Sequence, residues 1–208
     1  MTHVHRCSLV VAFVLVSSAA IATEPPTARQ PATATTEATR LGAEYFIQKA
    51  GAVWTYQLQS GGKGKVSINS FVEWKASFSF SLGKKSGSGT WRVKEGQWLE
   101  RSSSRADGEV VVLPAVMTRG SRWQAPASIE KGTRDVSQYE VLALDAQVDL
   151  PNGINVEHCL AVLETGLDGS APHTHYYAAN IGKVGVRGPE DWLFRLVEFR
   201  SGSRGHQE

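Results

Sequence analysis

The feature that most constrains the fold of this chain is an alternation of apolar and polar residues between positions 72 and 82. Every second side chain in this segment is apolar, and the side chains between them are Glu, Lys or Ser. Successive side chains of a β-strand point to opposite faces, so the pattern predicts a strand with one buried and one exposed face. The side chains expected on the buried face are Val72, Trp74, Ala76, Phe78, Phe80 and Leu82.

The same period recurs in short segments along the rest of the chain, separated by turns. Glycine-rich stretches at 61–64 and 83–89 are typical of turns, as is the Pro-Asn-Gly sequence at 151–153. The spacing of apolar residues at 136–148 fits either a strand or a helix. We favour a strand because both flanking segments are predicted strands. We therefore expect an all-β domain over residues 41–200: an antiparallel, strongly curved sheet or half-open β-barrel of about nine or ten short strands.

The segments outside this domain have a different composition. Residues 1–22 combine a short basic start, an apolar run of about eight residues and small residues that end at Ala22, which predicts a secretory signal peptide. The apolar run is shorter than the roughly 20 residues that span a bilayer, so we expect no transmembrane segment in the mature chain. Residues 23–40, with 6 Thr, 4 Ala and 3 Pro, predict a disordered tether, and residues 201–208 predict a disordered tail. The mature protein would then be periplasmic or secreted.

Removal of the signal peptide would leave Cys159 as the one cysteine of the mature chain. It lies between apolar neighbours, and we expect it to be buried and inert. The adjacent His158 would point to the opposite face of a strand, so the two side chains do not form a thiol–imidazole pair.

Four segments of the domain carry short aromatic and glycine motifs, at 45–56, 150–160, 176–184 and 192–200. The first three read YFIQKAGAVWTY, LPNGINVEHCL and YYAANIGKV. They resemble the "YFPL–G–W–Y", "PAGTF–C" and "YYAPGVGLV" motifs of a bacterial extracytoplasmic (periplasmic or lipoprotein-like) β-rich family of unknown function, and the fourth resembles its terminal strand. Residues 179–180 depart from the family pattern, with Ala and Asn in place of Pro and Gly. The resemblance implies an extracytoplasmic barrel-like domain and supplies no catalytic residues.

Charge excludes one class of partner and suggests another. The formal net charge is only +2, which argues against a dedicated nucleic-acid binder. Residues 41–106 nevertheless hold 10 Lys and Arg against 4 acids, whereas residues 107–191 hold 6 against 12. This asymmetry is either a chance property of a solvated exterior or a surface that docks another protein of the cell envelope.

The candidate metal ligands are two histidines spaced two residues apart. His173 and His175 would point to the same side of a strand, so both imidazoles could bind one metal ion, such as Zn²⁺. A third ligand is needed, and Asp168, Glu164 and His158 are the available choices. The alternative is that both histidines are solvated at the polar end of a hairpin.

The tryptophans are the candidate ligand-binding residues. Trp91, Trp98 and Trp123 lie in short, rather polar segments and could line the mouth of a binding site, although core packing is the favoured interpretation of these residues. Three others, Trp54, Trp74 and Trp192, lie on apolar faces and are expected in the core.

Two functions from different classes remain. The first is an exported non-enzymatic binding or scaffold module of the bacterial cell envelope, which carries a small apolar ligand or docks an envelope protein and needs no cofactor. The second is a metal-dependent hydrolase that uses His173 and His175.

Overall fold

A computed structural model describes residues 38–103, 108–126, 136–167 and 171–202 of the chain. The predicted signal peptide, nearly all of the predicted tether and most of the predicted tail lie outside these residues. Within them the prediction of an all-β fold is confirmed: the regular structure consists of antiparallel strands and one 3-10 turn.

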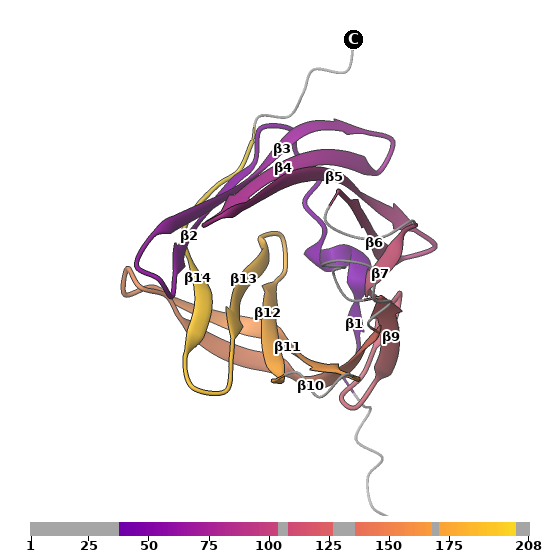
Figure 1. Ribbon diagram of the computed structural model, residues 1–208. Coiled ribbons are helices and arrows are strands. Elements are labelled where there is room, and N and C mark those ends of the chain that lie inside the picture. Colours follow the sequence, from indigo (N-terminus) through magenta and orange to yellow (C-terminus); the bar gives the residue numbers. More distant parts are fainter. Residues whose placement is uncertain (1–37, 104–107, 127–135, 168–170, 203–208) are drawn as a thin grey trace, which may run out of the picture. The chain divides into compact units, whose positions relative to one another are not determined.

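Twelve strands form one continuous antiparallel sheet in the described part of the chain. The sheet is strongly curved and nearly closed into a barrel (Figure 1). The sheet therefore has more strands than the predicted nine or ten. The strands are β2 (Val53–Leu58), β3 (Lys63–Val72), β4 (Lys75–Leu82), β5 (Lys85–Lys94), β6 (Gln97–Ser102), β7 (Val110–Leu113), β9 (Arg122–Pro126), β10 (Val136–Asp149), β11 (Asn155–Gly166), β12 (His173–Ala178), β13 (Gly182–Arg187) and β14 (Trp192–Arg200).

The order of these strands explains how the sheet curls. Strands β2 to β7 and strands β9 to β14 each pair with the next strand in the sequence, and β2 also pairs with β14. The first and last long strands are therefore neighbours, and the edges of the sheet are β7 and β9, which contact each other. A small second sheet of β1 (Arg40–Leu41) and β8 (Val116–Met117) lies beside these edges (Figure 1).

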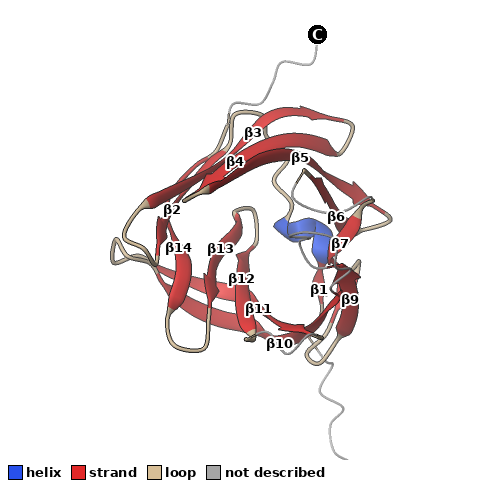
Figure 2. Cartoon of the chain, in the orientation of Figure 1, coloured by secondary structure: helices blue, strands red, loops and turns tan. Residues whose placement is uncertain are grey.

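One end of the barrel is filled by the segment that precedes β2. It contains the 3-10 turn η1 (Gly42–Tyr45), which lies inside the ring of strands (Figure 2). The side chains of Tyr45, Phe46 and Ile47 are at most 6% exposed, and the ring of Phe46 packs edge-on against Trp98. The backbone N–H of Asn180 in the β12–β13 turn donates to the carbonyl oxygen of Glu44, which ties this plug to the barrel wall.

The predicted strand at 72–82 is wrong at its first three residues. Glu73 and Trp74 have φ angles of 46° and 63° and form the turn between β3 and β4. Val72 therefore ends the preceding strand, and Trp74 is 53% exposed instead of buried. From Ala76 onwards the alternation holds, with Ala76 and Phe78 in the core.

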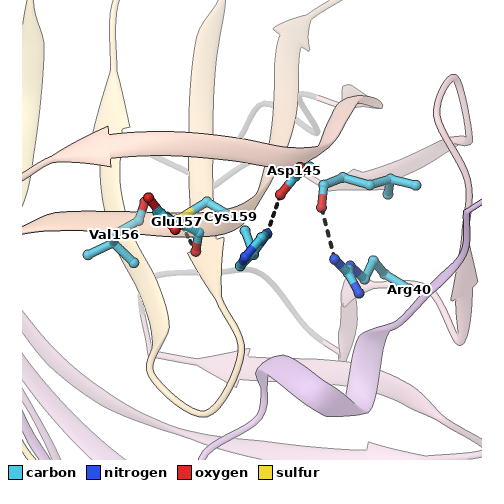
Figure 3. A network of polar contacts seen from close by, with 7 residues as sticks. Arg40, Asp145, Val156, Glu157 and Cys159 are labelled. Carbon is cyan, nitrogen blue, oxygen red and sulfur yellow. Dashed lines mark hydrogen bonds and ion pairs between the residues drawn. The ribbon is translucent and has the colours of Figure 1, made fainter.

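The ambiguous segment 136–148 is a strand, as predicted, and it pairs with β11. Strand β11 contains a bulge at His158, which is marked by a φ of 57° and an accompanying register shift. The bulge turns the imidazole outward, where its Nδ1 atom lies 2.5 Å from Asp145 Oδ1. It also turns Cys159 into the core, where its sulfur lies 3.5 Å from the carbonyl oxygen of Val156 (Figure 3).

The burial of Cys159 predicts an unreactive thiol. The side chain is fully buried, and burial raises its pKa from 9.0 to about 11, so the nucleophilic thiolate is scarce at neutral pH. We expect a Cys7→Ser variant of the chain to resist alkylation by iodoacetamide in buffer and to react fully in denaturant, as measured by mass spectrometry. Rapid alkylation of the folded protein would contradict this placement of Cys159.

Candidate functional site

A cavity of about 220 Å³ lies inside the barrel, between strands β2 to β7 and strands β13 and β14. It is partly open to solvent, and most of its lining residues are apolar or aromatic. Seven of the described residues that line it are aromatic. The lining residues are Ile47, Trp54, Tyr56, Val66, Phe78, Phe80, Leu82, Trp91, Trp98, Glu100, Val112, Gly182, Lys183 and Phe194.

The aromatic wall is organised around Trp91. Its ring stacks on Phe78 with the ring centroids 4.3 Å apart. It also meets Trp54 and Trp98 edge-on, at centroid distances of 5.9 and 5.5 Å. Offset stacks and edge-to-face contacts are the favoured arrangements of aromatic pairs, so these rings hold one another in fixed positions.

Hydrogen bonds also hold three of the lining rings in place. Trp91 Nε1 donates to Glu100 Oε2 at 3.0 Å, and Trp54 Nε1 donates to the carbonyl oxygen of Ile181 at 2.6 Å. Tyr56 donates its hydroxyl proton to the carbonyl oxygen of Lys183 at 2.9 Å, and burial raises the pKa of this phenol, which keeps it protonated as a donor. The cavity is therefore preformed, and a ligand would not have to order its walls.

Glu100 and Lys183 are the charged side chains among the described residues that line the cavity. Glu100 lies directly opposite Trp91 in the β5–β6 pair, which places both on the inner face. Lys183 comes from β13, and its Nζ atom lies 5.3 Å from the centroid of the Tyr177 ring. Neither residue was predicted from the sequence as part of a binding site.

The three predicted tryptophans have different positions. Trp91 and Trp98 do line the cavity, although Trp98 is also a core residue at 4% exposed. Trp123 is not among the lining residues; it stacks on Tyr139, with their centroids 5.4 Å apart. Of the three expected core tryptophans, Trp54 is buried and Trp192 is half-buried beneath Arg195, and Trp74 is exposed.

The buried histidine of the predicted metal pair has a carboxylate partner. His175 Nε2 lies 2.6 Å from Glu164 Oε2, and Tyr139 donates its hydroxyl proton to the other oxygen of Glu164 at 2.9 Å. Burial lowers the pKa of His175 to about 4. Burial also raises the pKa of Glu164, but its hydrogen bonds and, in acid where His175 is protonated, the charge of that ring outweigh this effect, so the pKa of Glu164 lies below its ordinary value. A neutral His175 thus donates to an ionised Glu164.

Of the other predicted metal ligands, His173 is in β12 two residues before His175 and is the cross-strand partner of Glu164. His158 is on the outside of the bulge with Asp145, and Asp168 lies outside the described residues. In the described part of the chain, no group of three His, Cys, Asp or Glu side chains is placed to hold a metal ion. The arrangement around Glu164 is that of a buried polar network that joins β10, β11 and β12.

This network predicts a loss of stability in acid. The pKa of His175 is lower in the folded chain than in the unfolded chain, so the unfolded chain binds more protons below about pH 6.5. Stability should therefore fall as the pH is lowered from about 6.5 towards 4. Because the pKa of Glu164 is lower in the folded chain than its ordinary value of 4.5, protonation of Glu164 should continue the loss of stability below that pH. We expect a decrease of about 2 kcal/mol between pH 7 and 4, measured by urea unfolding. A His175→Gln variant with an equally steep profile would contradict the assignment.

A second cavity, of about 310 Å³, lies at the plugged end of the barrel. Its lining comes from η1, the segment 46–49 and residues near β14, and it includes Glu44, Gln48, Lys49 and Asn180. Polar side chains and few aromatic rings make it less suited to an apolar ligand than the cavity inside the barrel.

Comparison with known proteins identifies no relative: no protein family, curated protein or solved structure matches the chain. The resemblance to an extracytoplasmic family therefore stays a prediction. The described residues include no helix that is long and apolar enough to cross a membrane.

Proposed function

We propose that this protein is an exported binding protein of the bacterial cell envelope that carries a small apolar ligand inside its barrel. The observation that carries the proposal is the preformed cavity of about 220 Å³ with its wall of aromatic rings. A dry cavity of about 150 Å³ accommodates benzene, so this one has room for a somewhat larger apolar molecule. Side chains of the barrel itself do not fill it, as they would in a purely structural barrel.

Export is supported by the signal-like pattern of residues 1–22, and the Thr-, Ala- and Pro-rich segment that follows would link the exported end to the barrel. A role as a carrier needs no catalytic group. The described residues around the cavity accordingly supply apolar contact area and few polar groups, which is typical of ligand pockets.

The proposal is tested by native mass spectrometry of the protein purified from the envelope of its own bacterium. We expect a retained small molecule that is released by organic solvent. A Leu82→Trp variant should lose it, because Leu82 lines the cavity and is only partly buried, so the larger ring can enter the cavity with little strain.

The matched control is Leu142→Trp, which makes the same substitution on the outer surface of β10, where Leu142 is 38% exposed. This variant should keep the ligand. Protein that carries no ligand, or a ligand that survives in Leu82→Trp with the fold intact by circular dichroism, would contradict the proposal.

A further inference from the structure

Exposed apolar side chains gather at the plugged end of the barrel, where the turns all lie within the described residues. The β3–β4 turn belongs to this end, because the plug packs a phenylalanine ring against Phe71 of β3. At this turn, Val72 is 65% exposed and Trp74 is 53% exposed. In the small sheet at the same end, the cross-strand partners Leu41 and Val116 are 47% and 58% exposed. These are four of the seven large apolar side chains that are exposed in the described part of the chain.

Backbone contacts join these side chains into one arc along the rim of the barrel. The backbone N–H of Val93, near the end of β5, donates to the carbonyl oxygen of Trp74 at 3.0 Å. A Cβ atom placed on Gly96, in the β5–β6 turn, would lie 3.2 Å from the Cβ atom of Ala115, which leads into β8. The arc therefore runs from the β3–β4 turn past the β5–β6 turn to β8 and β1. We use the name apolar arc for its four exposed side chains: Leu41, Val72, Trp74 and Val116.

The backbone at one end of the apolar arc is unfavourable for a tryptophan. Glu73 and Trp74 have φ angles of 46° and 63°, in the left-handed region that bulky residues rarely adopt. Two-residue hairpin turns with positive φ at both positions usually contain Asn and Gly. Because the indole ring is more than half exposed, its burial in the fold does not offset this cost. A costly backbone conformation that packing does not offset is typical of positions with a function.

The charged side chains beside the apolar arc balance one another. Glu73 and Lys75 flank Trp74, and Lys94 and Glu95 lie at the β5–β6 turn, and all four are exposed. Charged residues are depleted at the centre of protein–protein interfaces, so apolar side chains separated by charges fit a protein partner poorly. Tryptophan is by contrast enriched at membrane–water interfaces, and lysine suits the same place because its apolar stem is buried while its charge stays in water.

From this arrangement we infer that the apolar arc docks the protein on the surface of a lipid bilayer, with the ring of Trp74 among the lipid headgroups. The segment that precedes β1 is attached to the barrel at this arc, and it contains the apolar run at 9–16 that is predicted to engage the membrane during export. The inference goes beyond the proposed function, because the four side chains of the arc are not among those that line the cavity.

The test is co-sedimentation with vesicles of dioleoylphosphatidylcholine, using protein purified from the envelope of its own bacterium. We expect the wild-type protein to bind, and to stay bound in high salt, because the attraction comes from apolar area and the charges of the arc balance. Trp74→Ala should lower the partition coefficient by about tenfold or more, since it removes the largest apolar side chain of the arc. Lipids brominated in their acyl chains should quench the protein's fluorescence, and Trp74→Phe should remove this quenching.

Two double variants locate the docking surface. Val72→Ser combined with Val116→Ser should also weaken binding to the vesicles. Ile154→Ser combined with Leu167→Ser replaces two side chains outside the arc that are 55% and 60% exposed, and should leave binding unchanged. Equal losses in the two double variants, or wild-type protein that does not bind the vesicles, would overturn the inference. A dimer that Trp74→Ala dissociates, in protein that ignores vesicles, would overturn it by showing that the arc covers a second copy of the chain.

Discussion

Replacement of Trp98 by alanine is expected to lower the free energy of unfolding by about 3 to 5 kcal/mol, which is the range for large aromatic side chains removed from a protein core. Trp98 is 4% exposed, and its ring contacts Phe46 of the plug, Trp91 of the cavity wall and Tyr177 of β12. Its Nε1 atom is buried without a hydrogen-bond partner among the described residues, so the loss comes from packing.

The matched control is Trp74→Ala, the same substitution at a tryptophan that is 53% exposed in the β3–β4 turn. We expect this variant to change stability by no more than about 0.5 kcal/mol. Urea unfolding followed by far-ultraviolet circular dichroism measures both variants. Similar losses in the two variants would contradict the placement of the two tryptophans, and Trp98→Ala should also weaken ligand binding because the residue lines the cavity.

The second large effect is expected at Glu164. Glu164→Leu removes the acceptor for His175 and for the hydroxyl of Tyr139, and both donors are left in a buried site. Removal of one partner from a buried ion pair or hydrogen-bonded network costs about 3 to 5 kcal/mol, because the remaining polar groups have lost water without gaining a partner.

Glu140 provides the control for this substitution. It lies on β10, and its carboxylate pairs with Arg122 at 2.9 Å on the surface, where the two side chains are 29% and 61% exposed. Glu140→Leu should cost less than about 1 kcal/mol in the same unfolding assay, since surface ion pairs contribute little. If Glu164→Leu were as mild as Glu140→Leu, the buried network would not be a stabilising element.

The fold class could be predicted from the sequence because apolar and polar residues alternate in strands that have one buried face, such as β4. The alternation at Ala76 and Phe78 is correct, and the choice of a strand over a helix at 136–148 is also correct. The turn at Trp74 and the bulge at His158 were not predicted, and for the same reason. Both residues adopt a positive φ that is more typical of glycine or asparagine, so neither the turn nor the bulge has a compositional signal.

The cavity was only partly predictable. Trp91 and Trp98 were predicted to bind a ligand because they lie in short, rather polar segments. Glu100 was missed, even though the Glu95–Gly96 turn fixes the register of the hairpin. A two-residue turn there pairs Lys94 with Gln97, and the pairing then places Glu100 opposite Trp91. Lys183 could not have been found this way, because its approach to the cavity depends on contacts between strands far apart in the sequence.

Binding of an apolar molecule inside the barrel can be tested by soaking crystals of the protein with 2-bromonaphthalene and locating the bromine by its anomalous scattering. We predict a bromine peak inside the barrel, in the cavity lined by Trp54, Trp91 and Phe194, with the aromatic walls in the positions described above. A barrel interior without a peak, filled instead by its own side chains, would show that the barrel does not bind an apolar molecule.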